Sequence, residues 1–188
     1  MLNEKGLAAC MRAAWKGRGY TVLADDGEYF LNAKTWGVFC IKEAFPRNCL
    51  GLLATHLGAL PENGECWMLQ KDAGAQKQLF EDTMGVLEKL NASLQQESSR
   101  ICQTPLTLFG LEVWQNQRNM ETFCVCDEYS RIIDADTRSS GGLLTQVNGN
   151  PTLLFSAGEG LAFVIPRTRG EESLLGQLDG FPWCGDLA

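Results

Sequence analysis

Apolar residues in the first part of the chain alternate between helical and strand spacing. Residues 3–17 place Leu7, Met11 and Trp15 at helical spacing and end at glycines, which predicts an amphipathic helix. Three short apolar runs follow, with a turn signal at residues 25–27 and a polar link at residues 33–35. They predict a three-stranded antiparallel meander over residues 20–24, 29–32 and 36–41.

Helical spacing then returns after Pro46. Leu50, Leu53, Leu57 and Leu60 lie on one side of a predicted helix that ends at Pro61-Glu62-Asn63-Gly64. Residues 65–71 predict another strand, and residues 75–97 carry an apolar stripe that predicts the longest helix. The polar residues 95–100 form the predicted boundary of this first unit.

The rest of the chain has mostly strand patterning. Asn148-Gly149 between apolar runs is a strong hairpin signal, because both turn residues must accept positive φ. Residues 134–142 are polar and contain glycine, so the leucine-rich helix of the first unit is expected to be lost or shortened here. Residues after 166 turn polar and irregular, which predicts a flexible tail. The expected strands are 106–109, 112–117, 122–126, 143–147, 152–155 and 161–165.

One segment occurs twice, 84 residues apart. Residues 38–45 (VFCIKEAF) return as residues 122–129 (TFCVCDEY). The pattern predicts an α+β fold of two related helix-plus-antiparallel-sheet units, residues 1–100 and 101–169, followed by a tail at 170–188. The alternative is that any two amphipathic strands look alike. The same spacing pairs Glu28 with Glu112, Phe30 with Trp114, Asn32 with Asn116 and Lys34 with Arg118.

Composition is that of a globular chain with a substantial core. The 188 residues are 45% hydrophobic, and no run approaches the length of about 18 apolar residues that a membrane helix needs. With no secretion signal at the N-terminus, we expect a cytoplasmic protein that does not bind membranes. The eight cysteines are scattered through apolar runs, so reduced and mostly buried thiols are expected, with Cys40 and Cys124 as packing residues.

Charge is uneven along the chain. The net charge is −7, with 11 basic against 12 acidic residues in 1–100 and 5 against 11 in 101–188. This balance excludes a uniformly basic nucleic-acid binder but leaves room for a local basic stripe. Lys5, Arg12 and Lys16 form such a stripe, because their side chains fall within about 40° of one another on the predicted helix.

The sequence offers no convincing catalytic, metal or cofactor site. His56, the single histidine, lies in the leucine-rich helix and is expected to have a surface or packing role. Cys124 and Cys126 flank one strand residue and have no second closely spaced cysteine pair to complete a zinc site. Gly158-Glu159-Gly160 is too short for a phosphate-binding loop. A non-enzymatic protein is predicted, and an enzyme using cysteines and carboxylates is the least supported alternative.

The order of strand, leucine-rich helix, Leu60-Pro61-Glu62-Asn63-Gly64-Glu65 turn and strand resembles the recurring unit of DNA sliding clamps. The resemblance covers the first unit well and the second poorly. It implies duplicated units with sheets outside and helices toward DNA, so that Lys5, Arg12 and Lys16 would contact duplex phosphates. It also implies a homo-oligomer, because two units cannot close a ring around DNA.

The tail carries a separate resemblance. Residues 176–181 (GQLDGF) resemble the Gln-Leu-Asp-Leu-Phe peptide with which bacterial replication proteins dock into the clamp, with Gly180 where leucine is expected. It implies partner binding by Gln177, Leu178 and Phe181. The leading hypothesis is therefore a replication-associated protein that resembles a sliding clamp or docks on one. The alternative is an acidic protein-binding module, such as an inhibitor or immunity-type protein, that uses the second unit against a basic partner.

Overall fold

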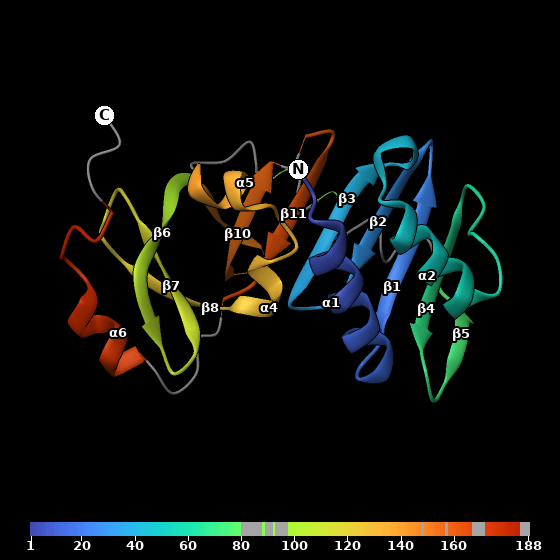
Figure 1. Cartoon of the computed structure of the whole chain (residues 1–188), viewed down its shortest axis with the longest axis horizontal. Helices are drawn as coiled ribbons and strands as arrows, with labels where there is room; N and C mark the ends of the chain where they lie inside the picture. Colours follow the sequence, from blue (N-terminus) through green and yellow to red (C-terminus); the bar gives the residue numbers. More distant parts are fainter. Residues whose placement is uncertain are drawn as a thin grey trace.

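The computed structural model describes residues 1–79, 88, 92, 98–147, 149–156, 158–166 and 172–184. Helices pack on an extended antiparallel sheet (Figure 1), which confirms the predicted mixture of helix and antiparallel sheet. The elements of the first half are α1 (Glu4–Lys16), β1 (Tyr20–Asp25), β2 (Glu28–Asn32), β3 (Trp36–Ile41), η1 (Lys42–Ala44), α2 (Arg47–Leu57), β4 (Glu65–Gln70) and β5 (Gly74–Lys77). Those of the second half are β6 (Ser99–Leu108), β7 (Leu111–Asn116), β8 (Thr122–Cys126), α4 (Asp127–Ser130), α5 (Ala135–Ser139), β9 (Gly142–Val147), β10 (Asn150–Ser156), β11 (Gly160–Val164) and α6 (Glu172–Leu178).

Helix α1 forms where the sequence predicts it, and local signals fix both of its ends. The side chain of Asn3 accepts a hydrogen bond from the Gly6 amide at the N-terminus, and Gly17 caps the C-terminus. Leu7 and Met11 are fully buried on the side that faces the sheet. Helix α1 therefore docks through one apolar stripe and leaves its other side to solvent.

The described strands form one sheet in the order β5-β4-β1-β2-β3-β11-β10-β9-β6-β7-β8. Strands β3 and β11 join the two halves, with Gly37 opposite Phe163 and Cys40 opposite Gly160. A Cβ atom on Gly37 would collide with the Phe163 ring, so this glycine makes room for the aromatic ring at the seam. The two predicted units thus share one continuous sheet.

Strand order repeats between the halves. The order β5-β4-β1-β2-β3 recurs as β10-β9-β6-β7-β8, with β11 between the two groups. The β2–β3 and β7–β8 hairpins have the same register at a spacing of 84 residues: Tyr29 pairs with Cys40, and Val113 pairs with Cys124. However, Tyr29 and Cys40 point into the core beneath α1 and α2, whereas Val113 and Cys124 point to the opposite face of the sheet, against α6. Residues 84 positions apart therefore keep the same pairing register within their hairpins but lie on opposite faces of the sheet.

Two predicted helices differ in the structure. Helix α2 ends at Leu57 rather than continuing to Leu60, because Gly58 adopts a left-handed conformation with φ of 90°. The helix predicted over 75–97 is wrong at its start, since Gly74–Lys77 forms β5 and pairs with β4. Most of that predicted helix lies outside the described residues. In the second half, α5 lies within residues 134–142, where the sequence predicts a shortened or lost helix, and α4 is a further short helix that the sequence does not predict.

The tail and two cysteines also differ from expectation. Residues 172–184, predicted to be flexible, form α6 and a following turn that pack on β7 and β8, with Leu175 inserted beside Leu111 and Val113. Apolar burial and a disulfide between Cys102 and Cys184 hold this segment in place. The prediction of reduced cysteines is therefore wrong for this pair. Cys40 and Cys124 are buried, as predicted.

No helix in the described part of the chain combines the length and the apolar character needed to cross a membrane.

Candidate functional site

The outer side of α1 carries the basic residues singled out by the sequence. Lys5, Arg12 and Lys16 all occupy exposed positions, opposite the buried Leu7 and Met11. Helix α1 lies beside α2 on the same side of the sheet (Figure 1). The helix periodicity that buries the apolar stripe therefore leaves the three cations on the solvent side.

Lys5 and Arg12 also line a groove of about 420 Å³ between α1 and α2. Lys16, one turn beyond Arg12, is not part of its lining. Glu4 lies at the groove as well, but its carboxylate accepts a hydrogen bond of 2.8 Å from the Asn48 amide in the first turn of α2. The groove thus offers basic and hydrogen-bonding side chains around one engaged carboxylate. Its remaining lining is Ala8, Asn48, Gly51, Leu52 and Thr55.

The sequence indicates the basic members of this groove but not the polar ones. Asn48 and Thr55 are seven residues apart and both are exposed, so they lie on the same side of α2. That spacing is a visible signal in the sequence. Its meaning depends on the packing of α2 against α1, which joins these residues to Lys5 and Arg12.

His56 serves packing between α1, α2 and β1. Its ring stacks on Trp15 at a centroid distance of 4.4 Å, and its Nδ1 lies 2.9 Å from the hydroxyl of Tyr20. Burial, with a further contribution from Arg12, lowers the pKa of His56 below its usual value. A neutral ring between two aromatic side chains suits a structural role.

A second cavity lies where the two halves meet. It has a volume of about 410 Å³, and Cys10 at its wall donates a hydrogen bond of 3.1 Å to the carbonyl of Glu128. Burial raises the pKa of Cys10 to about 12, so its thiol stays protonated at neutral pH and is a poor nucleophile. Cys10 therefore does not fit the role of a catalytic nucleophile. Other lining residues are Arg18, Lys34, Trp36, Cys126, Tyr129 and Pro166.

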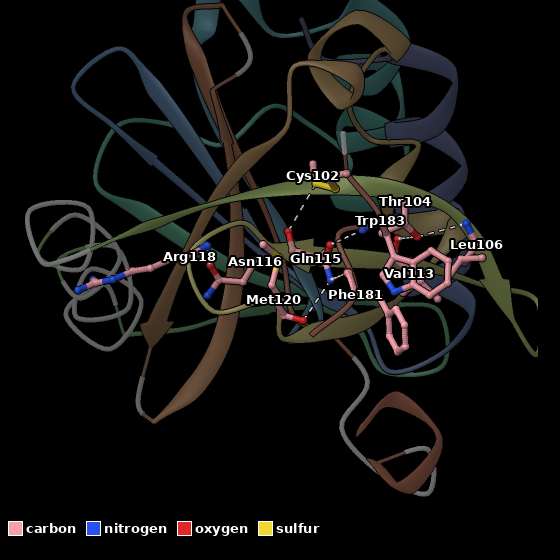
Figure 2. The surroundings of a disulfide bond; sticks show 11 residues. Cys102, Thr104, Leu106, Val113, Gln115, Asn116, Arg118, Met120, Phe181 and Trp183 are labelled. Atoms are coloured by element: carbon pink, nitrogen blue, oxygen red, sulfur yellow. Dashed lines mark hydrogen bonds between the residues drawn. A yellow bond between two sulfur atoms is a disulfide. The ribbon is translucent and has the colours of Figure 1, made fainter. Parts of the chain in front are cut away.

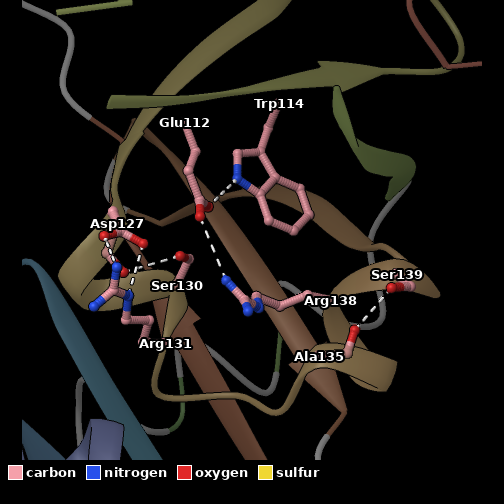
Figure 3. Close-up of polar contacts among 8 residues, drawn as sticks. All are labelled: Glu112, Trp114, Asp127, Ser130, Arg131, Ala135, Arg138 and Ser139. Atoms are coloured by element: carbon pink, nitrogen blue, oxygen red, sulfur yellow. Dashed lines mark hydrogen bonds and ion pairs between the residues drawn. The ribbon is translucent and has the colours of Figure 1, made fainter. Parts of the chain in front are cut away.

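Several acidic residues of the second half are engaged within the fold. Glu112 accepts hydrogen bonds from the Trp114 indole at 3.2 Å and from Arg138 at 3.4 Å, and Asp127 forms an ion pair with Arg131 (Figure 3). By contrast, acidic residues gather around the β1–β2 turn of the first half. Burial, followed by the charges of Asp26 and Asp25, raises the pKa of Glu28.

The proposed docking residues of the tail are not presented together. Leu178 packs against the apolar residues of β6 to β8, whereas Gln177 and Phe181 are exposed. The carbonyl of Leu178 also accepts a hydrogen bond of 2.9 Å from the Trp183 indole. An extended peptide that offers Leu178 and Phe181 to one pocket requires this segment to leave the sheet.

Within the described ranges, no group of three or more histidine, cysteine, aspartate or glutamate side chains is placed to hold a metal ion.

Comparisons with known proteins give only weak structural likeness. No protein-family model matches the chain, and no curated protein matches it. Among solved structures, a protein from Eubacterium rectale provisionally assigned as a DNA polymerase III beta subunit is similar, with 10% sequence identity and a TM-score of 0.36. The likeness covers 93% of this chain and 67% of that one. At these values it is a faint resemblance of fold, and nothing about function is drawn from it.

Proposed function

We propose that this chain is a non-enzymatic, DNA-associated protein that contacts the phosphate backbone through the outer side of α1. The observation that carries the proposal is the groove between α1 and α2, where Lys5 and Arg12 stand beside Asn48 and Thr55. Lysine, arginine and asparagine side chains are donors that bind phosphate oxygens without reading base sequence. The hydroxyl of Thr55 donates a hydrogen bond of 2.7 Å to the Gly51 carbonyl. Lys16 extends the basic stripe along the same helix.

Because the chain is negatively charged overall, the proposed DNA contact has to be confined to α1, and several copies of the chain have to contribute to it. The chain carries a net charge of −7, so the protein as a whole repels DNA. Three cations neutralise few phosphates, and the affinity of one such chain would be weak at physiological salt. The proposal therefore includes a homo-oligomer that presents several α1 helices to one duplex, as a replication clamp does. The repeated strand order supports the related proposal that the two halves arose by duplication.

Duplex binding measured by fluorescence anisotropy tests the proposal. Affinity should fall steeply between about 50 and 200 mM salt, and the Lys5→Ala, Arg12→Ala, Lys16→Ala triple variant should lose binding. A matched control removes three basic residues elsewhere, through Lys71→Ala, Lys77→Ala and Arg100→Ala, and should retain most of the affinity. Equal losses in both variants would point to net charge alone. No binding by the unmodified protein, or a monomer by light scattering, would overturn the proposal.

Docking of the tail on another replication protein is a narrower proposal. It needs Gln177, Leu178 and Phe181 together, and the packing of Leu178 works against it. The double variant Leu178→Ala, Phe181→Ala should abolish binding to a purified sliding clamp. Unchanged binding would remove this proposal without affecting the role of α1.

A second candidate function is an acidic module that binds a basic protein. The observation that favours it is the closeness of Asp25 and Asp26 to Glu28, whose pKa is raised by burial and then by these two charges. Burial, followed by the charges of Glu159 and Glu28, also raises the pKa of the nearby Cys40 thiol. These carboxylates lie at one end of β2, β3 and β11, so the surface joins both halves. Asp25→Asn with Asp26→Asn should weaken binding to a lysine-rich peptide probe, and unchanged affinity would exclude this surface.

A further inference from the structure

We propose that residues 172–184 form a strap over β7 and β8 that opens when a dithiol reduces the disulfide between Cys102 and Cys184. The proposal concerns a conformational change in the second half and does not rest on DNA binding by α1. It is carried by three kinds of contact that hold the strap: an apolar patch, a set of polar anchors and the disulfide.

The apolar contact is small but fully covers what lies beneath it. Leu175 of α6 packs against Leu111, Val113 and Cys124, and Leu178 lies against the same patch. Val113 and Cys124 have no exposed surface. Removing α6 would therefore uncover an apolar part of the sheet next to the edge strand β8.

The polar anchors fix the turn that follows α6. The amide of Gln115, which is 1% exposed, donates hydrogen bonds to the carbonyls of Phe181 at 2.7 Å and Met120 at 3.1 Å. Its oxygen accepts a hydrogen bond of 3.0 Å from the Trp183 amide (Figure 2). Nearer to α6, the carboxylate of Asp179 accepts hydrogen bonds of 2.8 Å from both the amide and the hydroxyl of Thr122.

The disulfide secures the far end of the strap. Cys184 comes directly after Trp183, and its partner Cys102 lies in β6, 82 positions earlier in the sequence, with the two Cα atoms 6.3 Å apart. Helix α6 has only seven residues, which is too short to be stable away from the sheet. Phe181 is 58% exposed and adds little burial. Cross-linking thus limits the freedom that the strap would gain on leaving the sheet.

Opening follows ordinary thiol–disulfide exchange. A thiolate of the dithiol attacks one sulfur of the protein disulfide and forms a mixed disulfide, which the second thiol of the reductant resolves. Cys102 and Cys184 gain two electrons and two protons and become thiols, and the dithiol is oxidised to its intramolecular disulfide. Among the described contacts, hydrogen bonds and the side chains of Leu175 and Leu178 then hold the strap.

Cys124 provides a direct readout, because it lies under Leu175. The full chain is reduced with dithiothreitol, the reductant is removed without air, and alkylation by iodoacetamide is followed at each cysteine by mass spectrometry. We expect alkylation of Cys124 to accelerate on the order of tenfold or more compared with the oxidised protein. Cys49, buried between α1 and α2, is the internal control and should not accelerate.

A variant removes the dependence on reductant. Cys184→Ser should expose Cys124 to the same degree without dithiothreitol, and the addition of dithiothreitol should then change nothing. Unchanged labelling of Cys124 in reduced protein, with Cys102 and Cys184 fully labelled, would overturn the strap. Parallel acceleration at Cys49 would also overturn it, because it would show general unfolding rather than local opening.

Discussion

The two halves of the sheet are covered by different means. In the first half, α1 and α2 have 13 and 11 residues and bury apolar side chains such as Met11 and Leu53 completely. In the second half, α4, α5 and α6 have four, five and seven residues. Short helices bury little surface, and hydrogen bonds, a partly buried ion pair and a disulfide take over part of their role. Similar strand order can thus be completed mainly by apolar packing or with a larger share of specific polar and covalent contacts.

The largest expected effect breaks the apolar cover of the first half. Leu53→Ala removes a fully buried side chain of α2 and should lower the free energy of unfolding by about 2–5 kcal/mol. Chemical denaturation checks this value. Leu60→Ala, at a side chain that is 44% exposed, is the matched control and should change stability by less than about 0.5 kcal/mol. Equal losses in both variants would contradict the assignment of α2 as the main cover.

The next effect tests a polar contact of the second half. The carboxylate of Glu112 contacts Arg138 and the Trp114 indole in Figure 3, and the Glu112 side chain is 11% exposed. Arg138→Ala leaves the indole as the remaining partner among these contacts. The loss should be about 2 kcal/mol in the free energy of unfolding, reduced from a fully buried pair by partial exposure. Arg131→Ala removes the more exposed pair with Asp127 and should cost less than about 1 kcal/mol. A larger loss for Arg131→Ala would reverse this ranking.

A smaller and more local effect is expected from Leu175→Ala. The side chain is 8% exposed and belongs to a helix that covers only the end of the sheet, so stability should fall by about 1–2 kcal/mol. Hydrogen exchange should accelerate mainly in β7 and β8, with α1 unchanged. Uniform acceleration across both halves would show that α6 is part of the general core.

The smallest effect concerns pH and the first half. The pKa of folded His56 lies below its usual 6.5, so as pH falls through about 6.5 the unfolded chain gains a proton that the folded chain does not. The free energy of unfolding should therefore decrease between neutral and mildly acidic pH. His56→Phe should flatten that dependence relative to the unmodified protein. An unchanged slope would show that His56 does not contribute to it.

Local sequence patterns predict individual strands and helices better than they predict which of these elements pair or pack together. Short apolar runs identify β2, β3, β7 and β8, and the Asn-Gly sequence signal predicts the hairpin of β9 and β10, in which Val147 pairs with Asn150. Strand β5 has the polar sequence Gly74-Ala75-Gln76-Lys77 and exists through its pairing with β4, so its own residues carry no strand signal. The docking of α6 likewise depends on β7 and β8, about fifty residues away along the chain.

The candidate site shows the same contrast between features that local sequence predicts and features that depend on tertiary packing. Helix periodicity alone predicts that Lys5, Arg12 and Lys16 lie together on the exposed side of α1. It cannot predict the groove, because Asn48 and Thr55 join it only through the packing of α2 beside α1. The link between Cys102 and Cys184 is also invisible locally, since the two residues are 82 positions apart.

The change of sheet face at a spacing of 84 residues has a geometric consequence. Six strand-to-strand steps separate β2 from β7, and a sheet that twists by about 20–25° per step turns by roughly 120–150° over that distance. At β7, the sheet face that packs against α6 is the opposite face from the one under α1 and α2. A twist of this size rotates that face back toward the direction of α1 and α2. Residues 84 positions apart can therefore lie on opposite faces of one sheet and still be turned toward a similar direction in space.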